Sequence, residues 1–408
     1  MMTVILRGMN AKGTWVVILA AAAILMVTMG VRQSLGLFVS PLNTSTGLGI
    51  VTISFAMAVA QFTWGAIQPI AGAVADRYGP GRVLALGLVV LALGSALTPF
   101  MTSGFGLIVA IGLLSAIGSG AGSFSVLIGA TARHLAAEQR GKGAGIINAG
   151  GSFGQFVFAP LSQALISAVG WMGAMWSLAV ITLAALPLVR YVAPRDAAPP
   201  KPAAGEAAMW PTVRDAFGDR SYLLLHAGFF TCGFHIAFLV THLPGEVNLC
   251  GLPPTVASWS LAIIGLANIV GSLLAGSSTM RYRSKYILAA MYGSRALLIG
   301  WFLLAPKTTG TFYVFAAGLG LTWLATVPPT AAIVGKLFGV RYLATLFGLT
   351  LLSHQVGGFL GAYLGGLAFA NTGDYQWMWY ADMALAAAAA LVNLPIREAP
   401  VARAPAAA

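Results

Sequence analysis

The sequence predicts an all-α membrane protein whose twelve transmembrane helices form two related six-helix halves. Only 8% of the 408 residues are Asp, Glu, Lys or Arg, against roughly 25% in soluble globular proteins. Hydrophobic residues make up 58% of the chain, and the mean hydropathy is +0.86. This composition leaves too little polar surface for a soluble protein and is too apolar for a disordered one. Long apolar stretches also follow one another along nearly the whole chain.

Each apolar stretch is long enough to cross a bilayer, whose hydrocarbon core of about 30 Å needs roughly 20 helical residues. The first stretch follows Arg7 and Lys12 and lacks the short core and cleavage site of a signal peptide. Short connections predict that neighbouring helices run antiparallel. We expect spans at residues 14–40, 50–74, 83–102, 105–131, 143–168, 171–189, 221–245, 255–279, 286–306, 311–335, 344–370 and 377–396.

The basic residues indicate how these spans are oriented in the lipid bilayer. The chain has 22 Lys and Arg against 10 Asp and Glu, a net charge of +12, which in a soluble protein would suggest a nucleic-acid partner. With the N-terminus inside, however, 19 of the 22 fall on inside segments, and only Lys307 falls outside. Because Lys and Arg favour cytoplasmic loops, we expect both termini in the cytoplasm of a bacterial cell, an inner-membrane location and no nucleic-acid partner.

The two halves share a weak internal repeat. Three sets of residues recur in order at offsets of 203 or 204 residues, which favours duplication over chance. The matched sets are Gly30, Arg32 and Pro41 with Gly233, His235 and Pro244; Gly72, Arg77 and Tyr78 with Gly276, Arg281 and Tyr282; and Gly145, Gly154 and Phe156 with Gly348, Gly357 and Phe359. We expect halves at 1–190 and 221–408, joined by a cytoplasmic linker at 191–220. Six spans per half predict a parallel repeat with a binding site between the halves, near the midplane.

The loop between the second and third spans carries the most specific motif, Gly72-x-x-x-Asp76-Arg77-x-Gly79-Pro80-Gly81-Arg82. Together with the twelve-span plan, this loop resembles the major facilitator superfamily of secondary transporters, and the resemblance covers essentially the whole chain. It implies that Asp76 and Arg77 latch the two halves together on the cytoplasmic side. Gly72, Asp76, Arg77, Gly79 and Arg82 are therefore predicted gating residues. The alternative is a solvated turn with ordinary cytoplasmic charge.

A finer resemblance lies in Gly30-Val-Arg32-Gln-Ser-Leu-Gly-Leu-Phe38 and in Arg140-Gly-Lys-Gly-Ala-Gly145, which opens the fifth span. Both segments are similar to the monocarboxylate and oxalate/formate transporter branch, whose first helix carries a basic residue near this position. One departure stands out. Monocarboxylate transporters commonly carry an Asp and then an Arg on the eighth span, where this chain has Asn268 and Ser272.

Arg32 and His235 are the strongest candidate site residues because ionisable groups in hydrocarbon are costly and usually face a cavity or a partner. Arg32 lies nine residues before Pro41, about 13–14 Å of helix and therefore near the midplane. His235 occupies the matching position of the second half. A fixed guanidinium facing a titratable imidazole would suit a carboxylate that travels with a proton. The alternatives are a snorkelling arginine and a packed histidine.

Further polar residues within the spans complete the predicted site. On the fifth span Asn148, Ser152 and Gln155 share one helical face, which either binds substrate or joins helices. His354 is a second candidate ligand or proton carrier. Arg295 either contacts substrate or pairs with Asp382, which is also a proton-coupling candidate. Pro328 and Pro329 should kink the tenth span, which transporters tolerate where helices line a cavity. The candidate lining residues are Gln61, Trp64, Gln68, Asn268 and Trp323.

The sequence contains no phosphate-binding loop, no metal-ligand spacing and no nucleophile with a matching base. We therefore expect no enzyme, no cofactor and no metal. The predicted function is secondary active transport of a small organic anion, most simply a monocarboxylate, by a monomer that uses alternating access with a proton or counter-anion. The alternative is an efflux antiporter for a drug, metabolite or inorganic oxyanion. A receptor on this scaffold would carry a larger cytoplasmic tail than this chain has after Arg397.

Overall fold

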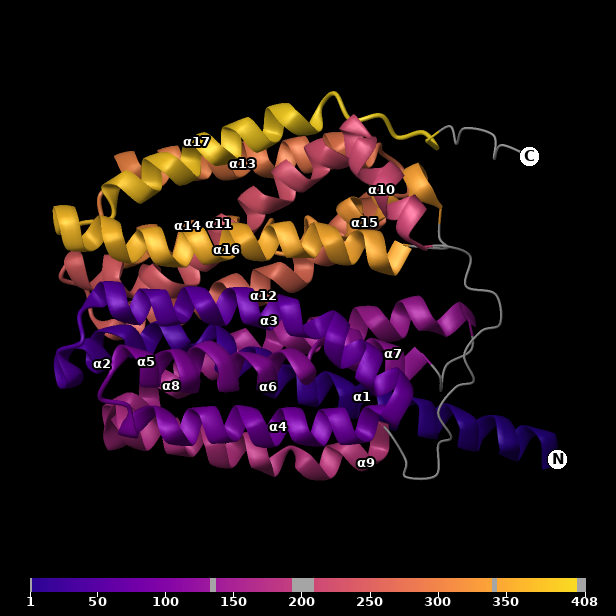
Figure 1. Cartoon of the computed structure of the whole chain (residues 1–408), viewed down its shortest axis with the longest axis horizontal. Helices are drawn as coiled ribbons and strands as arrows, with labels where there is room; N and C mark the ends of the chain where they lie inside the picture. Colours follow the sequence, from indigo (N-terminus) through magenta and orange to yellow (C-terminus); the bar gives the residue numbers. More distant parts are fainter. Residues whose placement is uncertain (1, 133–136, 193–208, 340–342, 402–408) are drawn as a thin grey trace.

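The computed structural model describes residues 2–132, 137–192, 209–339 and 343–401, and these ranges contain helices and turns without any β-strand. Figure 1 shows two helical bundles stacked side by side, the first built from the N-terminal half and the second from the C-terminal half. We call the end of the molecule at which α9 stops and α10 starts the linker end, and the other end the far end. This linker end lies on the right of Figure 1.

The first bundle holds six spans, several of which are assembled from more than one helical segment. The fifth and sixth spans are one continuous run, α8, that turns at Gly170, where φ is +72° and glycine is favoured. The segments are α1 (Met2–Gln33), η1 (Leu35–Phe38), α2 (Val39–Thr46), α3 (Ile50–Tyr78), α4 (Pro80–Leu97), η2 (Thr98–Phe100), α5 (Gly104–Leu107), η3 (Ile108–Ser115), α6 (Ala116–Ala121), α7 (Phe124–Ala132), α8 (Ala137–Ala184), η4 (Leu186–Leu188) and α9 (Val189–Val192).

The second bundle repeats this plan, and its tenth span is broken between two short helices. The break at 321–326 precedes Pro328 and Pro329, which lie in the first turn of the following helix, where proline is tolerated. The helices are α10 (Met209–Gly218), α11 (Arg220–Leu249), α12 (Pro254–Ser278), α13 (Ser284–Leu304), α14 (Thr309–Gly320), α15 (Val327–Phe338), α16 (Leu343–Thr372) and α17 (Gln376–Asn393).

The described residues contain eight helical runs that are long and apolar enough to cross a membrane. One of them, residues 143–192, is two spans joined at Gly170. Three further spans complete the set of twelve: α14 together with α15, then α16, then α17. The twelve-span prediction therefore agrees with the fold. The predicted linker at 191–220 lies partly outside the described residues, and its described part contains α10.

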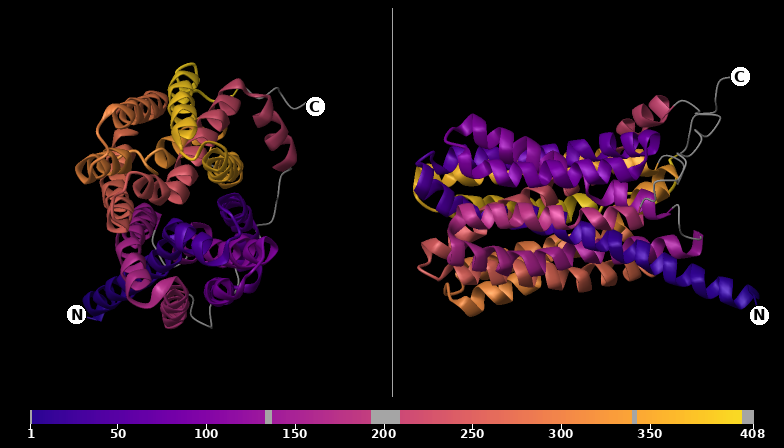
Figure 2. Two further views of the ribbon diagram at one scale, coloured as in Figure 1. Left: turned by 90° about the vertical axis from the view of Figure 1, so that its left-hand side faces the viewer. Right: turned by 90° about the horizontal axis from the view of Figure 1, so that it is seen from below.

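The halves meet along two long helix pairs, α3 with α16 and α8 with α12, and where η1 reaches α11. Viewed along the helices, the two bundles lie side by side (Figure 2). Glycines permit the close contacts: a Cβ on Gly36 would overlap the Val240 carbonyl, and one on Gly366 would overlap Ser54. Both of these contacts between the halves lie between the middle of the molecule and its far end.

At the linker end, Glu398 ties the chain after α17 to two neighbouring segments of the second half. Its carboxylate accepts hydrogen bonds from the Lys285 amide at 2.6 Å and the Lys336 ammonium at 2.5 Å. Burial alone would raise the pKa of Glu398, but these donors and the Lys336 charge outweigh it and lower that pKa below its usual value.

Candidate functional site between the halves

Arg32 is the penultimate residue of α1, three residues before η1 begins. Its guanidinium donates to the Gln61 side-chain oxygen of α3 and stands 4.0 Å from the centre of the Trp64 ring. In the part of the chain that the structure describes, no carboxylate lies within ion-pair distance of Arg32. A partly buried cation is therefore held by one amide and one aromatic face, and its charge is not neutralised.

A cavity of about 20 Å³ lies beside Arg32, which is roughly the room needed by one water molecule. Met57 and Ile111 give it apolar walls, and Ser115 and Thr241 add hydroxyl groups. Thr241 comes from α11, so the cavity reaches the interface between the halves. Its fourth-span wall is the π-helical segment η3, where the Ser115 hydroxyl donates to the Ala110 carbonyl at 2.9 Å. Such π-helical turns recur at functional sites.

Three other buried side chains near the interface have polar atoms without a protein partner among the described residues. They are the Trp64 indole nitrogen, the Gln155 amide nitrogen and the Gln355 side-chain oxygen. Gln155 packs on Gly265 of α12, and Gln355 packs on Gly65 of α3, so both face the opposite half. Because buried polar groups are normally hydrogen-bonded, these atoms are available to a polar ligand.

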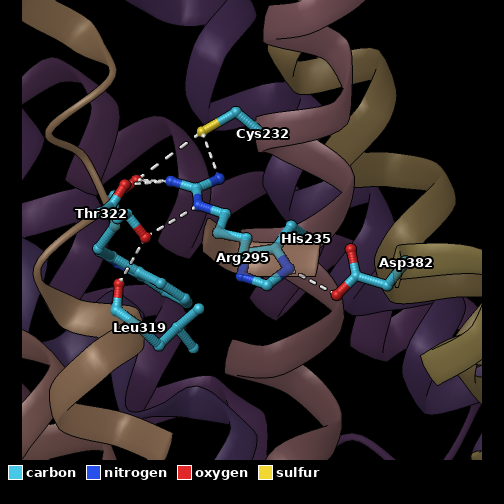
Figure 3. A network of polar contacts seen from close by, with 7 residues as sticks. Cys232, His235, Arg295, Leu319, Thr322 and Asp382 are labelled. Carbon is cyan, nitrogen blue, oxygen red and sulfur yellow. Dashed lines mark hydrogen bonds and ion pairs between the residues drawn. The ribbon is translucent and has the colours of Figure 1, made fainter. Parts of the chain in front are cut away.

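His235 is buried in the second half and does not share contacts with Arg32. Its Nδ1 lies 2.5 Å from Oδ2 of Asp382 on α17, as Figure 3 shows. The Trp323 ring packs at its side, with ring centres 6.0 Å apart. The other ring nitrogen of His235 and the second Asp382 oxygen have no protein partner among the described residues. The His235 side chain therefore joins two helices of one half, and its depth relative to Arg32 stays a prediction.

Arg295 is 1% exposed and donates to the backbone at the break in the tenth span. Its Nη2 bonds the carbonyls of Thr322 and Trp323, the latter at 2.7 Å, and its Nε bonds the Thr322 hydroxyl at 3.1 Å (Figure 3). The Cys232 sulfur lies 3.5 Å from Nη1. The suggested Arg295 pairing with Asp382 is wrong, because carbonyls freed by the helix break take the guanidinium.

Asn268 of α12 forms hydrogen bonds both to the first half and to the break in the tenth span. Its amide nitrogen donates to the Ser152 hydroxyl of α8 at 2.8 Å, and its oxygen accepts from the Leu324 amide at 2.9 Å. Ser152 thus joins helices. Asn148, one turn away on α8, is only half-buried.

His354 lies on α16 beside the aromatic interior of the second half. Its Nδ1 is 3.4 Å from the Gln355 amide nitrogen, and its ring centre is 5.0 Å from that of Phe229. Its backbone carbonyl also lies against Gly233 of α11. His354 therefore neighbours the unpartnered Gln355 but has no described contact with Arg32.

The predicted gating loop is a tight connection from α3 to α4. Gly79 has φ +92°, a conformation that favours glycine, and Pro80 opens α4. Arg77 and Arg82 are exposed, and the Arg77 guanidinium lies 5.3 Å from the Tyr78 ring centre. A side chain at Gly72 would meet open space. The Asp76 side chain lies outside what the structure describes, so the latch stays a prediction.

Sequence reasoning missed the groups whose roles depend on backbone geometry. Ser115 and Thr241 line the cavity, and the Thr322 and Trp323 carbonyls hold Arg295. The only sequence signal near the latter was the Pro328–Pro329 pair, which marks a helix disturbance but not its acceptors.

The fold and this polar centre are typical of a multi-pass membrane transport protein with a small-molecule substrate. The chain matches the family model described as Major Facilitator Superfamily over residues 18–253 and 247–408. It therefore belongs to the Major Facilitator Superfamily.

Relatives and solved structures are similar over most of their length. Rat (Rattus norvegicus) monocarboxylate transporter 13 is 27% identical over 93% of this chain and 89% of its own. The uncharacterized MFS-type transporter YcxA of Bacillus subtilis is 24% identical over 88% of this chain and 90% of its own. The structure of a D-xylose-proton symporter superposes with a TM-score of 0.74 at 14% identity. The match covers 94% of this chain and 97% of the symporter. At that identity the structural match shows the fold alone.

Proposed function

We propose that this transporter moves a small monocarboxylate across the membrane, with Arg32 binding the carboxylate. The observation that carries the proposal is the partly buried guanidinium without a carboxylate partner in the described chain. A charge left unneutralised at this depth is costly, and an anionic substrate would supply the missing charge. Relatives that are named monocarboxylate transporters, such as the rat protein, support the same substrate class.

The surrounding groups support a ligand that is small and rich in hydrogen-bond acceptors. The free Trp64 and Gln155 nitrogens are both donors. The adjoining cavity has apolar walls and room for only about one water molecule in this structure, so a substrate must widen it, and a short carbon chain requires less widening than a large drug. In this proposal Asn148 extends the donor set, whereas Arg295 and Asn268 position the tenth span and do not touch substrate.

We assign proton coupling to the buried His235 and Asp382 pair, with His354 as the second candidate. A carboxylate and an imidazole 2.5 Å apart can share or release one proton when their surroundings change. Exchange with a counter-anion is the other mode of coupling, and it would leave this pair without a role in transport.

Transport measurements with purified protein in liposomes test the substrate class. We expect uptake of labelled lactate, pyruvate or formate by counterflow, and accumulation driven by an imposed pH gradient. Oxalate, phosphate and a cationic dye serve as comparison substrates in the same vesicles. Movement of the dye or phosphate alone would contradict the carboxylate proposal and favour the antiporter for a drug, metabolite or inorganic oxyanion.

We further propose that transport uses alternating access, with the linker end in the cytoplasm and the far end closed in this structure. The basic residues on linker-end segments support this orientation. The approach of Gly36 to the Val240 carbonyl and of Gly366 to Ser54 supports closure of the far end.

Replacing Gly36 by Val should slow transport because the added side chain would overlap the Val240 carbonyl and prevent this closure. A change of about 1.4 kcal/mol in the balance between open and closed states alters their ratio tenfold, so we expect at least about a tenfold lower counterflow rate. The matched control is Gly145→Ala, since a Cβ there meets open space. Equal rates for Gly36→Val and the wild type would contradict closure at this contact.

A further inference from the structure

A lateral groove with a volume of about 480 Å³ lies on the second half, apart from the central site. Its walls come from α16 and α17, which both pack on α11. In Figure 1, α17 and α16 run on either side of α11. Small side chains keep the walls apart, since Ala227 of α11 and Ala388 of α17 line it.

The groove opens on the outer face of α11 rather than into the core of the second half. Cys232, on the opposite side of this helix, contacts the Trp323 carbonyl and the Thr326 hydroxyl of the tenth span. By contrast, Ala227 and Ala388 are exposed, and Val356 of α16 is 42% exposed. The exposed residues of this apolar outer face lie along membrane spans, where they border the hydrocarbon of the bilayer rather than the interface between the halves.

The interior of this groove suits an apolar chain. Most of its few polar side-chain atoms meet protein partners: His226 Nδ1 lies 2.6 Å from the Ser353 hydroxyl, and the Thr231 hydroxyl donates to the Ala227 carbonyl at 3.3 Å. His226 Nε2 is a buried polar atom of this lining without a partner among the described residues. The Phe217 ring of α10 covers His226 from the linker end, with ring centres 5.3 Å apart. The remaining lining is aliphatic or aromatic, including Leu385 and Val392.

Two arginines stand at the linker end of the same groove. Arg220 is the first residue of α11, and Arg397 follows α17, where its backbone amide donates to the Ser221 hydroxyl at 3.0 Å. Both side chains are exposed and form no ion pair with another described residue. His226 lies six residues into α11, about 9 Å along the helix from Arg220. A pair of cations therefore stands at the membrane surface above an apolar channel.

We propose that this groove binds an anionic phospholipid of the surrounding membrane. One acyl chain lies between α16 and α17, and the phosphate meets Arg220 and Arg397. Basic residues at the membrane surface attract anionic headgroups, while the acyl chain gains from contact with apolar walls. A zwitterionic lipid would fill the groove equally well but would gain less from the two arginines.

Native mass spectrometry of the full-length protein tests this assignment. The protein is extracted into detergent with equal amounts of phosphatidylglycerol and phosphatidylcholine, and the bound lipid is counted for each species. We expect retained phosphatidylglycerol on the wild type and about a 30-fold loss in the Arg220→Gln/Arg397→Gln variant, as for two headgroup contacts of about 1 kcal/mol each. The matched control is Arg281→Gln, an exposed arginine at the linker end of α12.

A second substitution tests the acyl-chain part separately. Ala388→Trp should fill the groove and displace both lipids, whereas Leu391→Trp should not, because Leu391 is 67% exposed on the same helix but outside the groove. Equal retention of the two lipids by the wild type, or equal loss in Arg281→Gln, would overturn the headgroup assignment. Equal displacement by both Trp variants would overturn the groove. Should Ala388→Trp fail to fold, Val356→Trp replaces it on the other wall.

Discussion

Replacing Arg32 by Gln is expected to weaken carboxylate transport strongly while leaving the protein folded in the membrane. Glutamine retains hydrogen-bonding groups near Gln61 but removes the positive charge beside Trp64. Loss of one partner from a desolvated, hydrogen-bonded charge pair costs about 2–5 kcal/mol, so the apparent affinity should fall about 30-fold or more. The measurement is the concentration dependence of labelled pyruvate counterflow in liposomes.

Two controls separate the charge of Arg32 from its shape and from general damage. Arg32→Lys keeps the charge but loses the planar fork that holds a carboxylate with two hydrogen bonds, so transport should survive at a reduced rate. Arg190→Gln removes an exposed arginine near the linker end and should transport normally. Wild-type counterflow of every tested carboxylate by Arg32→Gln would rule out the anion site.

Replacing Asp382 by Asn should separate proton coupling from substrate exchange. The amide still fits beside His235, but the buried pair loses the carboxylate that would hold the shared proton. We expect the pH gradient to drive no accumulation, while counterflow, which needs no net proton movement, keeps a substantial rate. The measurement compares both assays on the same vesicles. Normal gradient-driven accumulation would move the coupling to His354 or to another group.

The Asp382 pair is also expected to matter for stability, which gives a readout independent of transport. Removing one partner of a buried pair costs about 3–5 kcal/mol because an uncompensated group remains. Asp382→Ala should therefore lower the thermal unfolding temperature in detergent sharply. His235→Ala/Asp382→Ala should cost less than the sum of the single changes. Additive losses would show that the two side chains do not act as a pair.

The spans could be predicted from the sequence because hydropathy and length depend on local composition alone. The sequence also indicated the turn at Gly170, between two predicted spans, and the disturbance near Pro328. The repeat relates Arg32 and His235, which lie on α1 and α11, the first spans of the two halves. It did not predict their partners, because an offset in sequence does not determine which neighbour a side chain faces.

The partners of Arg295 and His235 were beyond sequence reasoning for different reasons. Arg295 is held by backbone carbonyls, which every residue carries and which become available only where a helix breaks. His235 is held by Asp382, which lies 147 positions later in the chain and approaches through tertiary packing. Asn268 was predicted as a lining residue, but its bond to Ser152 depends on how the halves dock.

The side-chain amide of Asn268 links the first bundle to the break in the tenth span. The Asn268 amide nitrogen donates a hydrogen bond to Ser152 of the first bundle, and its side-chain oxygen accepts one from the Leu324 amide in the break of the tenth span. A rocking movement between the bundles must therefore break the Asn268–Ser152 bond or move the turn at this break, because Asn268 and Leu324 both belong to the second bundle. Arg295 also donates to the Thr322 and Trp323 carbonyls of the same turn, so the turn is held by both Asn268 and Arg295.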